Sequence, residues 1–129
     1  MLKGFEKQTE ELNAYELQTL VPVLVAGLRC KVGKRCAVTN KYIVRMLKDK
    51  YRVSDVRVRK VINYIRLNAL VPCLVATSDG YYVAQTEDEL RDYEQSLYGR
   101  ECAIRNVRLA IAKQREQTFT REPNLFNQN

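Results

Sequence analysis

The chain has 129 residues, which is the usual size of one domain with a single hydrophobic core. Hydrophobic residues make up 46% of it and charged residues 29%, which excludes a disordered or fibrous protein. With no histidine, no phosphate-binding glycine motif and no evident pair of catalytic carboxylates, the sequence indicates a protein that is not an enzyme. We expect no cofactor, no metal and no small-molecule ligand.

Positive charge is concentrated in one third of the chain. Lysine and arginine total 22 against 15 aspartate and glutamate, and thirteen of these cations lie in residues 29–68, where only Asp49 and Asp55 oppose them. A cationic run is often only a solvated face, but one confined in this way is also typical of a protein that binds a polyanion. The arrangement of residues within 29–68 must therefore distinguish a solvated face from a surface that binds a polyanion.

The cysteine and apolar patterns indicate a cytoplasmic protein. The four cysteines form no C-x-x-C pair, and the first residues lack the apolar segment of a signal peptide, so we expect four reduced, mostly buried thiols. The longest apolar run, residues 20–28, is too short to cross a bilayer, and no membrane partner is predicted.

Two helices are predicted after a polar arm of residues 1–12. Asn13 and Glu16 form a capping box that opens the first helix, which Pro22 either kinks or divides before its end near residue 33. Thr39 is placed to cap a second helix over residues 40–49. The buried face of that second helix is expected to consist of Ile43, Met46 and Leu47.

The helix predicted over residues 55–68, with Ser54 as its cap, has the most regular pattern. At about 100° per residue, one side is an aliphatic stripe, formed by Val58, Val61, Ile62 and Ile65. The other side is rich in cations and hydrogen-bond donors, and it carries Val56, Lys60 and Asn63 flanked by Arg57, Arg59 and Tyr64. We therefore expect one side to face the core and the other to be basic and exposed.

A β-hairpin and a long helix complete the chain. Residues 71–77 and 81–84 read as two strands joined by the turn residues Ser78, Asp79 and Gly80. Thr86 is placed to cap a helix that continues to about residue 117, and residues 118–129 are expected to form a flexible tail. The predicted fold class is mostly α with one small hairpin.

This order of elements resembles the winged helix-turn-helix domains that bind DNA, most closely over residues 39–85. The resemblance is carried by the capping Ser54, by the buried positions four, eight and eleven residues after it, and by the glycine-turned hairpin. Ala69 stands where this family prefers glycine. Residues 77–90 also resemble small winged-helix proteins of phage and prophage gene sets. The resemblance implies a winged helix-turn-helix domain at 13–85, followed by a long C-terminal helix at 86–117.

Such a domain is expected to bind double-stranded DNA, with helix 55–68 in the major groove. Arginine and lysine there suit guanine or phosphate, asparagine suits adenine and valine suits a thymine methyl group, while the start of helix 40–49 suits phosphate. The predicted DNA-binding residues are Thr39, Asn40, Lys41, Asp55, Val56, Arg57, Arg59, Lys60, Asn63 and Tyr64. Asp79 at the hairpin tip argues against insertion of the wing into the minor groove, and Tyr81 and Tyr82 either contact the DNA backbone or pack on the domain.

The long C-terminal helix carries a repeat of apolar residues. Leu90, Leu97, Ile104 and Ile111 are spaced by seven, and Tyr93 and Val107 occupy the second position of the same seam, which Arg100 and Gln114 interrupt. The stripe can pack on the winged helix of its own chain or form a homodimer seam, and both readings stay open.

The function predicted from these patterns is sequence-preferring binding of double-stranded DNA by a transcriptional regulator or replication-associated factor of a phage or mobile element. Such a protein would associate with the nucleoid when bound. The alternative is a winged-helix module that docks another protein without binding DNA. RNA binding is disfavoured, because the chain has neither an RNP-type aromatic motif nor a GxxG loop.

Overall fold

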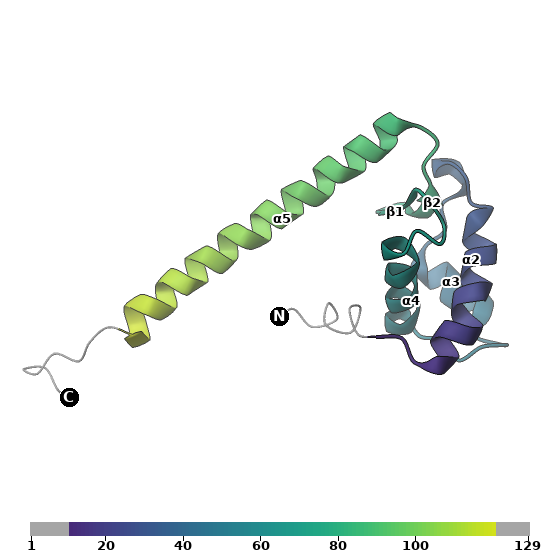
Figure 1. Cartoon of the computed structure of the whole chain (residues 1–129), viewed down its shortest axis with the longest axis horizontal. Coiled ribbons are helices and arrows are strands. Elements are labelled where there is room, and N and C mark those ends of the chain that lie inside the picture. The colour runs from purple at the N-terminus through teal and green to yellow at the C-terminus, as the bar shows by residue number, and fades with distance from the viewer. Residues whose placement is uncertain (1–10, 121–129) are drawn as a thin grey trace, which may run out of the picture. The chain divides into compact units, whose positions relative to one another are not determined.

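The computed structural model describes residues 11–120, which divide into two compact units, one ending at Leu90 and one beginning at Arg91. The first unit contains helices and a two-stranded antiparallel hairpin, and the second consists of the continuation of the long helix α5 (Figure 1). The elements are η1 (Glu16–Leu20), α2 (Val21–Arg29), η2 (Lys34–Cys36), α3 (Asn40–Leu47), α4 (Asp55–Leu67), β1 (Leu74–Thr77), β2 (Gly80–Val83), α5 (Glu87–Arg115) and η3 (Glu116–Thr120). The expectation of a mostly helical chain with one small hairpin is confirmed. Most of the predicted N-terminal arm, residues 1–10, and residues 121–129 of the predicted tail lie outside the described residues.

The first helix begins with the predicted capping box. The backbone N–H of Asn13 donates to Glu16 Oε1 at 2.9 Å, and the N–H of Glu16 donates to Asn13 Oδ1 at 2.8 Å. The π-helical turn η1 then leads directly into α2, with Pro22 in its first turn. Because proline has no N–H and its ring clashes with the carbonyl four residues earlier, a wider turn before it lets the helix continue.

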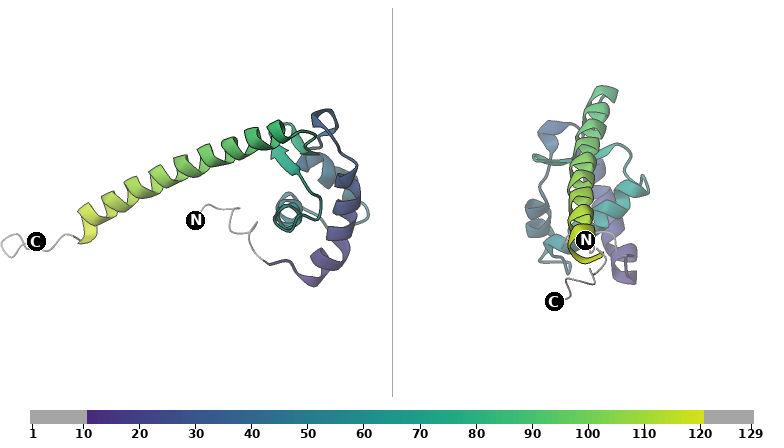
Figure 2. Two further views of the ribbon diagram at one scale, coloured as in Figure 1. Left: turned by 45° about the horizontal axis from the view of Figure 1, so that its top comes forward. Right: turned by 90° about the vertical axis from the view of Figure 1, so that its left-hand side faces the viewer.

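Helix α4 packs against both α2 and α3, and residues of all three helices form one core (Figure 2). Both predicted caps are present: Thr39 Oγ1 accepts the N–H of Tyr42 at 3.1 Å, and Ser54 Oγ accepts the N–H of Arg57 at 3.2 Å. The aliphatic stripe of α4 is confirmed as the centre of the core, where Val58, Val61, Ile62 and Ile65 are at most 1% exposed.

The hairpin is tied to the segment that precedes α3. Strand β1 pairs with β2 so that Thr77 lies opposite Gly80. On its other edge, β2 meets the chain again, because Tyr81 and Val38 exchange two backbone hydrogen bonds of 2.7 and 3.0 Å. The hairpin therefore fixes the point at which α3 begins.

Helix α4 ends in a turn that requires an unusual backbone conformation. Ala69 has a φ of 52°, the N–H of Leu70 donates to the carbonyl of Ile65, and the N–H of Ala69 donates to that of Arg66. This is a Schellman motif, in which the residue after the cap lies in the left-handed region and glycine is favoured. The expectation that this position suits glycine has a structural cause here.

Replacing Ala69 by glycine is expected to raise the free energy of unfolding by about 0.5–1 kcal/mol, since relief of the left-handed strain outweighs the added entropy of the unfolded chain. Urea denaturation measures the change. Ala26 in α2 is the matched control, because it is an exposed residue in a helix interior, where glycine should cost about 1 kcal/mol. If both substitutions changed the free energy of unfolding equally, the assignment of a strained left-handed conformation to Ala69 would be wrong.

Helix α5 begins with a second capping box between Thr86 and Glu89, with N–H to side-chain distances of 3.1 Å in both directions. Its α-helical part ends at Arg115, and the π-helical turn η3 extends to Thr120, so residues 118–120 of the predicted tail are helical. None of the helices in residues 11–120 is both long enough and apolar enough to cross a membrane.

The expectation of mostly buried thiols is wrong. Cys30, Cys36 and Cys73 are exposed and Cys102 is half-buried, and all four are free. Each of the three exposed cysteines lies at a helix end or in a connecting turn, where the core does not cover it.

Candidate functional site

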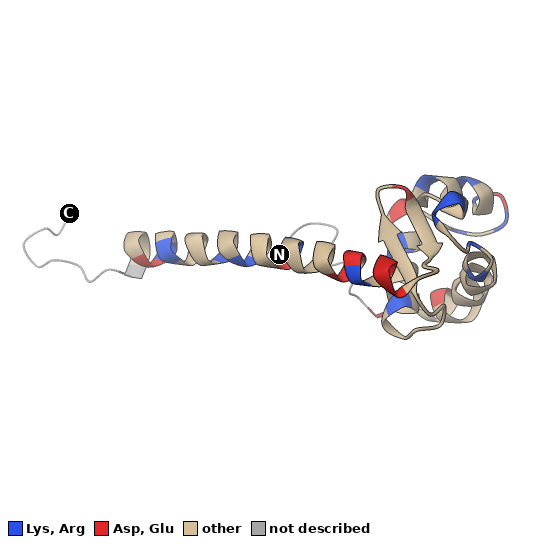
Figure 3. Cartoon of the chain, turned by 90° about the horizontal axis from the view of Figure 1, so that it is seen from above, with Lys and Arg blue, Asp and Glu red and all other residues tan. Residues whose placement is uncertain are grey.

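The first unit exposes most of the positive charge that the sequence concentrates in residues 29–68. Nine of the thirteen cations are exposed there, spread over the end of α2, the connecting segments, α3 and α4 (Figure 3). They are Arg29, Lys34, Arg35, Lys41, Arg45, Lys48, Lys50, Arg52 and Arg59. Lys34 forms an ion pair of 3.5 Å with Asp79, so the one acid at the hairpin tip is partly neutralised within the chain.

Two of the cations predicted to contact DNA are engaged in the interior. Glu16 of η1 is 2% exposed, and its carboxylate receives Lys60 Nζ on Oε1 and Arg57 Nε on Oε2, each at 3.0 Å. The side chain of Lys60 is 13% exposed and that of Arg57 is 30% exposed. The expectation that both lie on an open basic face of α4 is wrong, because these long side chains turn back towards η1 to pair with a carboxylate that burial would otherwise leave uncompensated.

Arg57 is held by further contacts. Its Nη1 donates to the carbonyl of Arg52 at 3.0 Å, and its guanidinium lies 5.5 Å from the centre of the Tyr15 ring. Arg52 lies over the same ring at 4.5 Å, while its N–H donates to the Tyr15 hydroxyl. These contacts join the turn before α4 to the first helix, so substituting Arg57 tests folding before it tests binding.

The pKa of Glu16 shows that the carboxylate is stabilised in its charged form. Burial raises the pKa of this group, but the N–H of Asn13, the hydrogen bond and charge of Lys60 and the hydrogen bond of Arg57 together lower it more. The net pKa lies below the ordinary value for glutamate. Glu16 therefore remains ionised in the fold and holds its two cations in place.

Asn40 is also used inside the domain. Its amide donates to the carbonyl of Asp55 at 3.0 Å, and its Oδ1 accepts the Tyr81 hydroxyl at 2.9 Å. Asn40 thus joins the starts of α3 and α4 to strand β2. Tyr81 and Tyr82 are buried, which confirms packing on the domain rather than an exposed position, and Tyr64 packs partly buried against the core.

A basic ridge runs along α3, and the predicted site included only Lys41 of its three cations. Lys41, Arg45 and Lys48 follow one another at intervals of four and three residues, so they share one side of the helix, opposite the buried Ile43 and half-buried Leu47. All three are exposed and form no ion pair with any described residue. Their spacing is visible in the sequence, where Arg45 and Lys48 follow Lys41 at helical intervals.

On α4, Arg59 is the one exposed cation. Thr39, Asn40 and Arg59 line a polar hollow together with the hairpin, completed by Ala76, Thr77, Ser78, Gly80 and Tyr81. Val56 and Asn63 share the side of α4 that carries Arg59, Val56 being exposed and Asn63 half-buried. The structure therefore brings Thr39, Arg59 and the hairpin together, while Lys41 continues the exposed charge onto α3.

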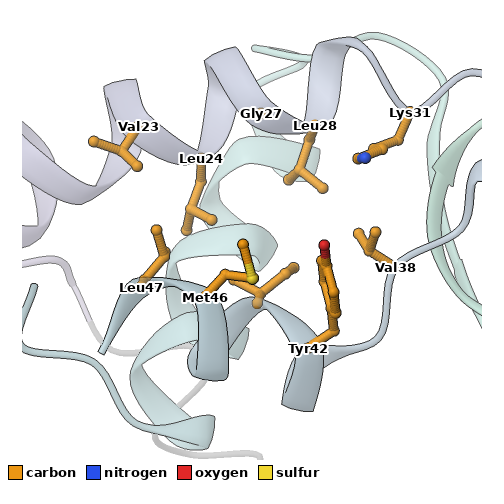
Figure 4. A pocket seen from close by; sticks show the side chains of 10 residues that line it. Val23, Leu24, Gly27, Leu28, Lys31, Val38, Tyr42, Met46 and Leu47 are labelled. Carbon is orange, nitrogen blue, oxygen red and sulfur yellow. The ribbon is translucent and has the colours of Figure 1, made fainter. Parts of the chain in front are cut away.

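A second surface feature is an apolar groove between α2 and α3 (Figure 4). Tyr42 and Met46 stand at its α3 side and are 43% and 60% exposed, and Val23 and Gly27 lie at its α2 side. The other lining residues are Leu24, Leu28, Lys31, Val38, Ile43 and Leu47. Met46, predicted to be buried, is instead exposed at the rim of this groove.

The chain matches no known family model, no curated protein and no solved structure. Within residues 11–120 there is no group of three or more cysteine, aspartate or glutamate side chains placed to hold a metal ion. The functional argument therefore depends on the charge, exposure and geometry described above.

Proposed function

We propose that the first unit is a winged helix-turn-helix domain that binds double-stranded DNA, with the basic ridge of α3 and Arg59 of α4 as its cationic contacts. The observation that carries the proposal is the exposed ridge, which has no acidic partner among the described residues. Exposed lysine and arginine on one side of a short helix suit a row of phosphates, and neutralising phosphates supplies most of the affinity of many DNA-binding proteins.

The arrangement of α3, α4 and the hairpin supports this proposal. Helices α3 and α4 pack together across a short connection, and the hairpin follows α4 in the chain, as in a helix-turn-helix with a wing. Thr39 and Lys41 at the start of α3 would contact phosphate, and Val56, Arg59 and Asn63 on α4 would approach base edges. With Arg57 and Lys60 bound to Glu16, we expect less base readout than the sequence implied.

The double variant Lys41→Ala/Arg45→Ala tests the ridge. If both cations contact phosphate, the slope of log K against log salt should fall by about 1.8, since each lost contact removes about 0.9. Duplex binding by fluorescence anisotropy across a salt series measures this. The matched control is Arg105→Ala/Lys113→Ala, which removes the same charge from exposed positions of α5 and should leave the slope nearly unchanged.

Two results would count against the proposal. If the ridge variant and the control have the same slope, the ridge is not the contact surface. If the unmodified chain shows no salt-dependent duplex binding, the DNA-binding function fails. Arg59→Ala adds a separate readout, because loss of a base contact relaxes sequence preference, while loss of a phosphate contact weakens all sequences alike.

The apolar groove favours a second candidate function, the docking of another protein. An exposed tyrosine and an exposed methionine at the edge of an apolar groove are typical of surfaces that accept an apolar side chain. Under this alternative, Met46→Asp would abolish partner binding, and any duplex binding by the unmodified chain would depend only slightly on salt. A role in transcription or replication of a phage or mobile element stays a prediction from the sequence resemblance.

A further inference from the structure

Helix α5 has an apolar stripe that is not buried within its own unit. The helix runs without interruption from Glu87 to Arg115, and no residue within it is buried. Leu97, Ile104, Val107 and Ile111 are between 38% and 63% exposed. Apolar residues repeated over four heptads at this exposure are typical of a helix that pairs with another helix.

The charges beside the stripe change sign along the helix. One flank of the stripe is formed by the residues that follow Leu90, Leu97, Ile104 and Ile111 by four positions. These residues are Glu94, Glu101, Arg108 and Arg115, so this flank is acidic in its first half and basic in its second. All four are exposed and none forms an ion pair with a described residue. The other flank consists of Glu89, Ser96, Ala103 and Ala110 and contains no cation. Figure 3 shows the acidic residues gathered at the start of α5.

This pattern distinguishes between the two ways in which identical helices can pair. In a parallel pair, each flank faces the opposite flank of the partner, so Glu89 would face Glu94 while Arg108 and Arg115 would face alanines. In an antiparallel pair, each flank faces the same flank of the partner helix, which runs in the opposite direction. The acidic half of the flank therefore meets the basic half of the partner's flank. The charges therefore complement each other only when the helices run in opposite directions.

We propose that α5 binds α5 of a second copy of this chain in an antiparallel helix pair. Glu94 and Glu101 pair with Arg115 and Arg108 of the other copy, and the small residues of the second flank allow the helices to approach closely. In this register Tyr93 packs against Ile111 of the other copy, and Leu97 packs against Val107. Arg100 falls beside Ile104, where its aliphatic stem covers the stripe and its charged group reaches solvent.

The pairing does not depend on DNA binding, although it has a consequence for it. The two Leu90 residues, where the first units end, would lie about 36 Å apart along the pair at 1.5 Å per residue. That separation is close to one helical turn of DNA, about 34–36 Å. This consequence rests on the proposed function, whereas the self-association is tested without DNA.

Charge reversal in the whole 129-residue chain tests the orientation by sedimentation equilibrium. Glu94→Arg/Glu101→Arg makes the flank wholly basic, and Arg108→Glu/Arg115→Glu makes it wholly acidic. Each variant alone should dissociate, with a dissociation constant raised by about tenfold or more, and an equimolar mixture of the two should restore the dimer. The quadruple variant with all four reversals is the control, because it keeps the complementarity and should dimerise.

Circular dichroism on each variant reports whether α5 is retained, so that loss of pairing is distinguished from loss of the helix. The proposal is overturned if the unmodified chain is a monomer throughout the concentration series. It is also overturned if the wholly basic variant dimerises as well as the unmodified chain, which is the result that parallel pairing predicts. Failure of duplex binding with the dimer intact would reject the proposed function and leave this inference standing.

Discussion

Replacing Glu16 by alanine is expected to lower the free energy of unfolding by about 3 kcal/mol, one of the two largest effects that we expect of a single substitution. The carboxylate is 2% exposed and accepts hydrogen bonds from Asn13, Lys60 and Arg57. Its removal leaves Lys60, whose side chain is 13% exposed, without a counter-charge, and opens the capping box of the first helix. Denaturant titration measures the loss.

Glu11 is the control for this substitution. It is an exposed glutamate near the same helix, and its replacement by alanine should change the free energy of unfolding by less than about 0.5 kcal/mol. If both variants lose equal stability, the buried ion pairs do not support the fold. A small loss for Glu16→Ala would mean that Lys60 and Arg57 reach solvent easily, and would return them to the set of candidate DNA contacts.

The same carboxylate predicts how stability depends on pH. Because the folded pKa of Glu16 lies below the ordinary value of 4.5, the ionised form is favoured in the fold. Its contribution is fully present above that value and is lost as the pH falls through the folded pKa. Glu16→Gln should therefore be less stable than the unmodified chain at neutral pH, and the difference should narrow in acid. If the difference in stability between Glu16→Gln and the unmodified chain did not change with pH, the lowered pKa of Glu16 would be contradicted.

The elements that were predicted correctly depend on contacts within four residues along the chain. The caps Thr39, Ser54 and Thr86, the first capping box and the stripe of α4 all follow from spacings of three and four, which the sequence displays directly. Helix ends were less accurate: helix 40–49 ends at Leu47, and strand 71–77 begins only at Leu74. End positions depend on packing as well as on local pattern.

The residues of the candidate site were predicted less accurately than the helices and strands. The incorrect assignments involve side chains that contact residues far away in the sequence. Glu16 lies 41 residues before Arg57, and nothing in the local pattern of α4 indicates that a carboxylate from η1 will bind the cations there. Asn40 and Tyr81, which form a side-chain hydrogen bond, are also 41 residues apart. The ridge of α3 differs, since its spacing of four and three residues is a local pattern that the sequence alone contains.

Gly80→Ala is the other substitution expected to have a large effect, a loss of about 3 kcal/mol in the free energy of unfolding. The backbone at Gly80 has a φ of 118°, which a residue with a side chain rarely adopts. An added Cβ would lie 2.4 Å from the carbonyl oxygen of Val38 and 3.0 Å from the nitrogen of Thr39. Both are backbone atoms, so the contact can be relieved only by moving the hairpin away from the start of α3.

The Gly80 substitution also connects the fold to the proposed interface. The sequence pattern assigns Gly80 to the turn, but it pairs with Thr77 as the first residue of β2, and the need for glycine comes from the close approach of Val38. Gly27→Ala is the control, because nothing lies within 4 Å of its added Cβ, and alanine in a helix should stabilise by up to about 1 kcal/mol. If Gly80→Ala unfolds at the same denaturant concentration as the unmodified chain, the hairpin does not fix the position of Thr39. The polar hollow that contains Arg59 would then lack the rigid support on which the proposed DNA contact depends.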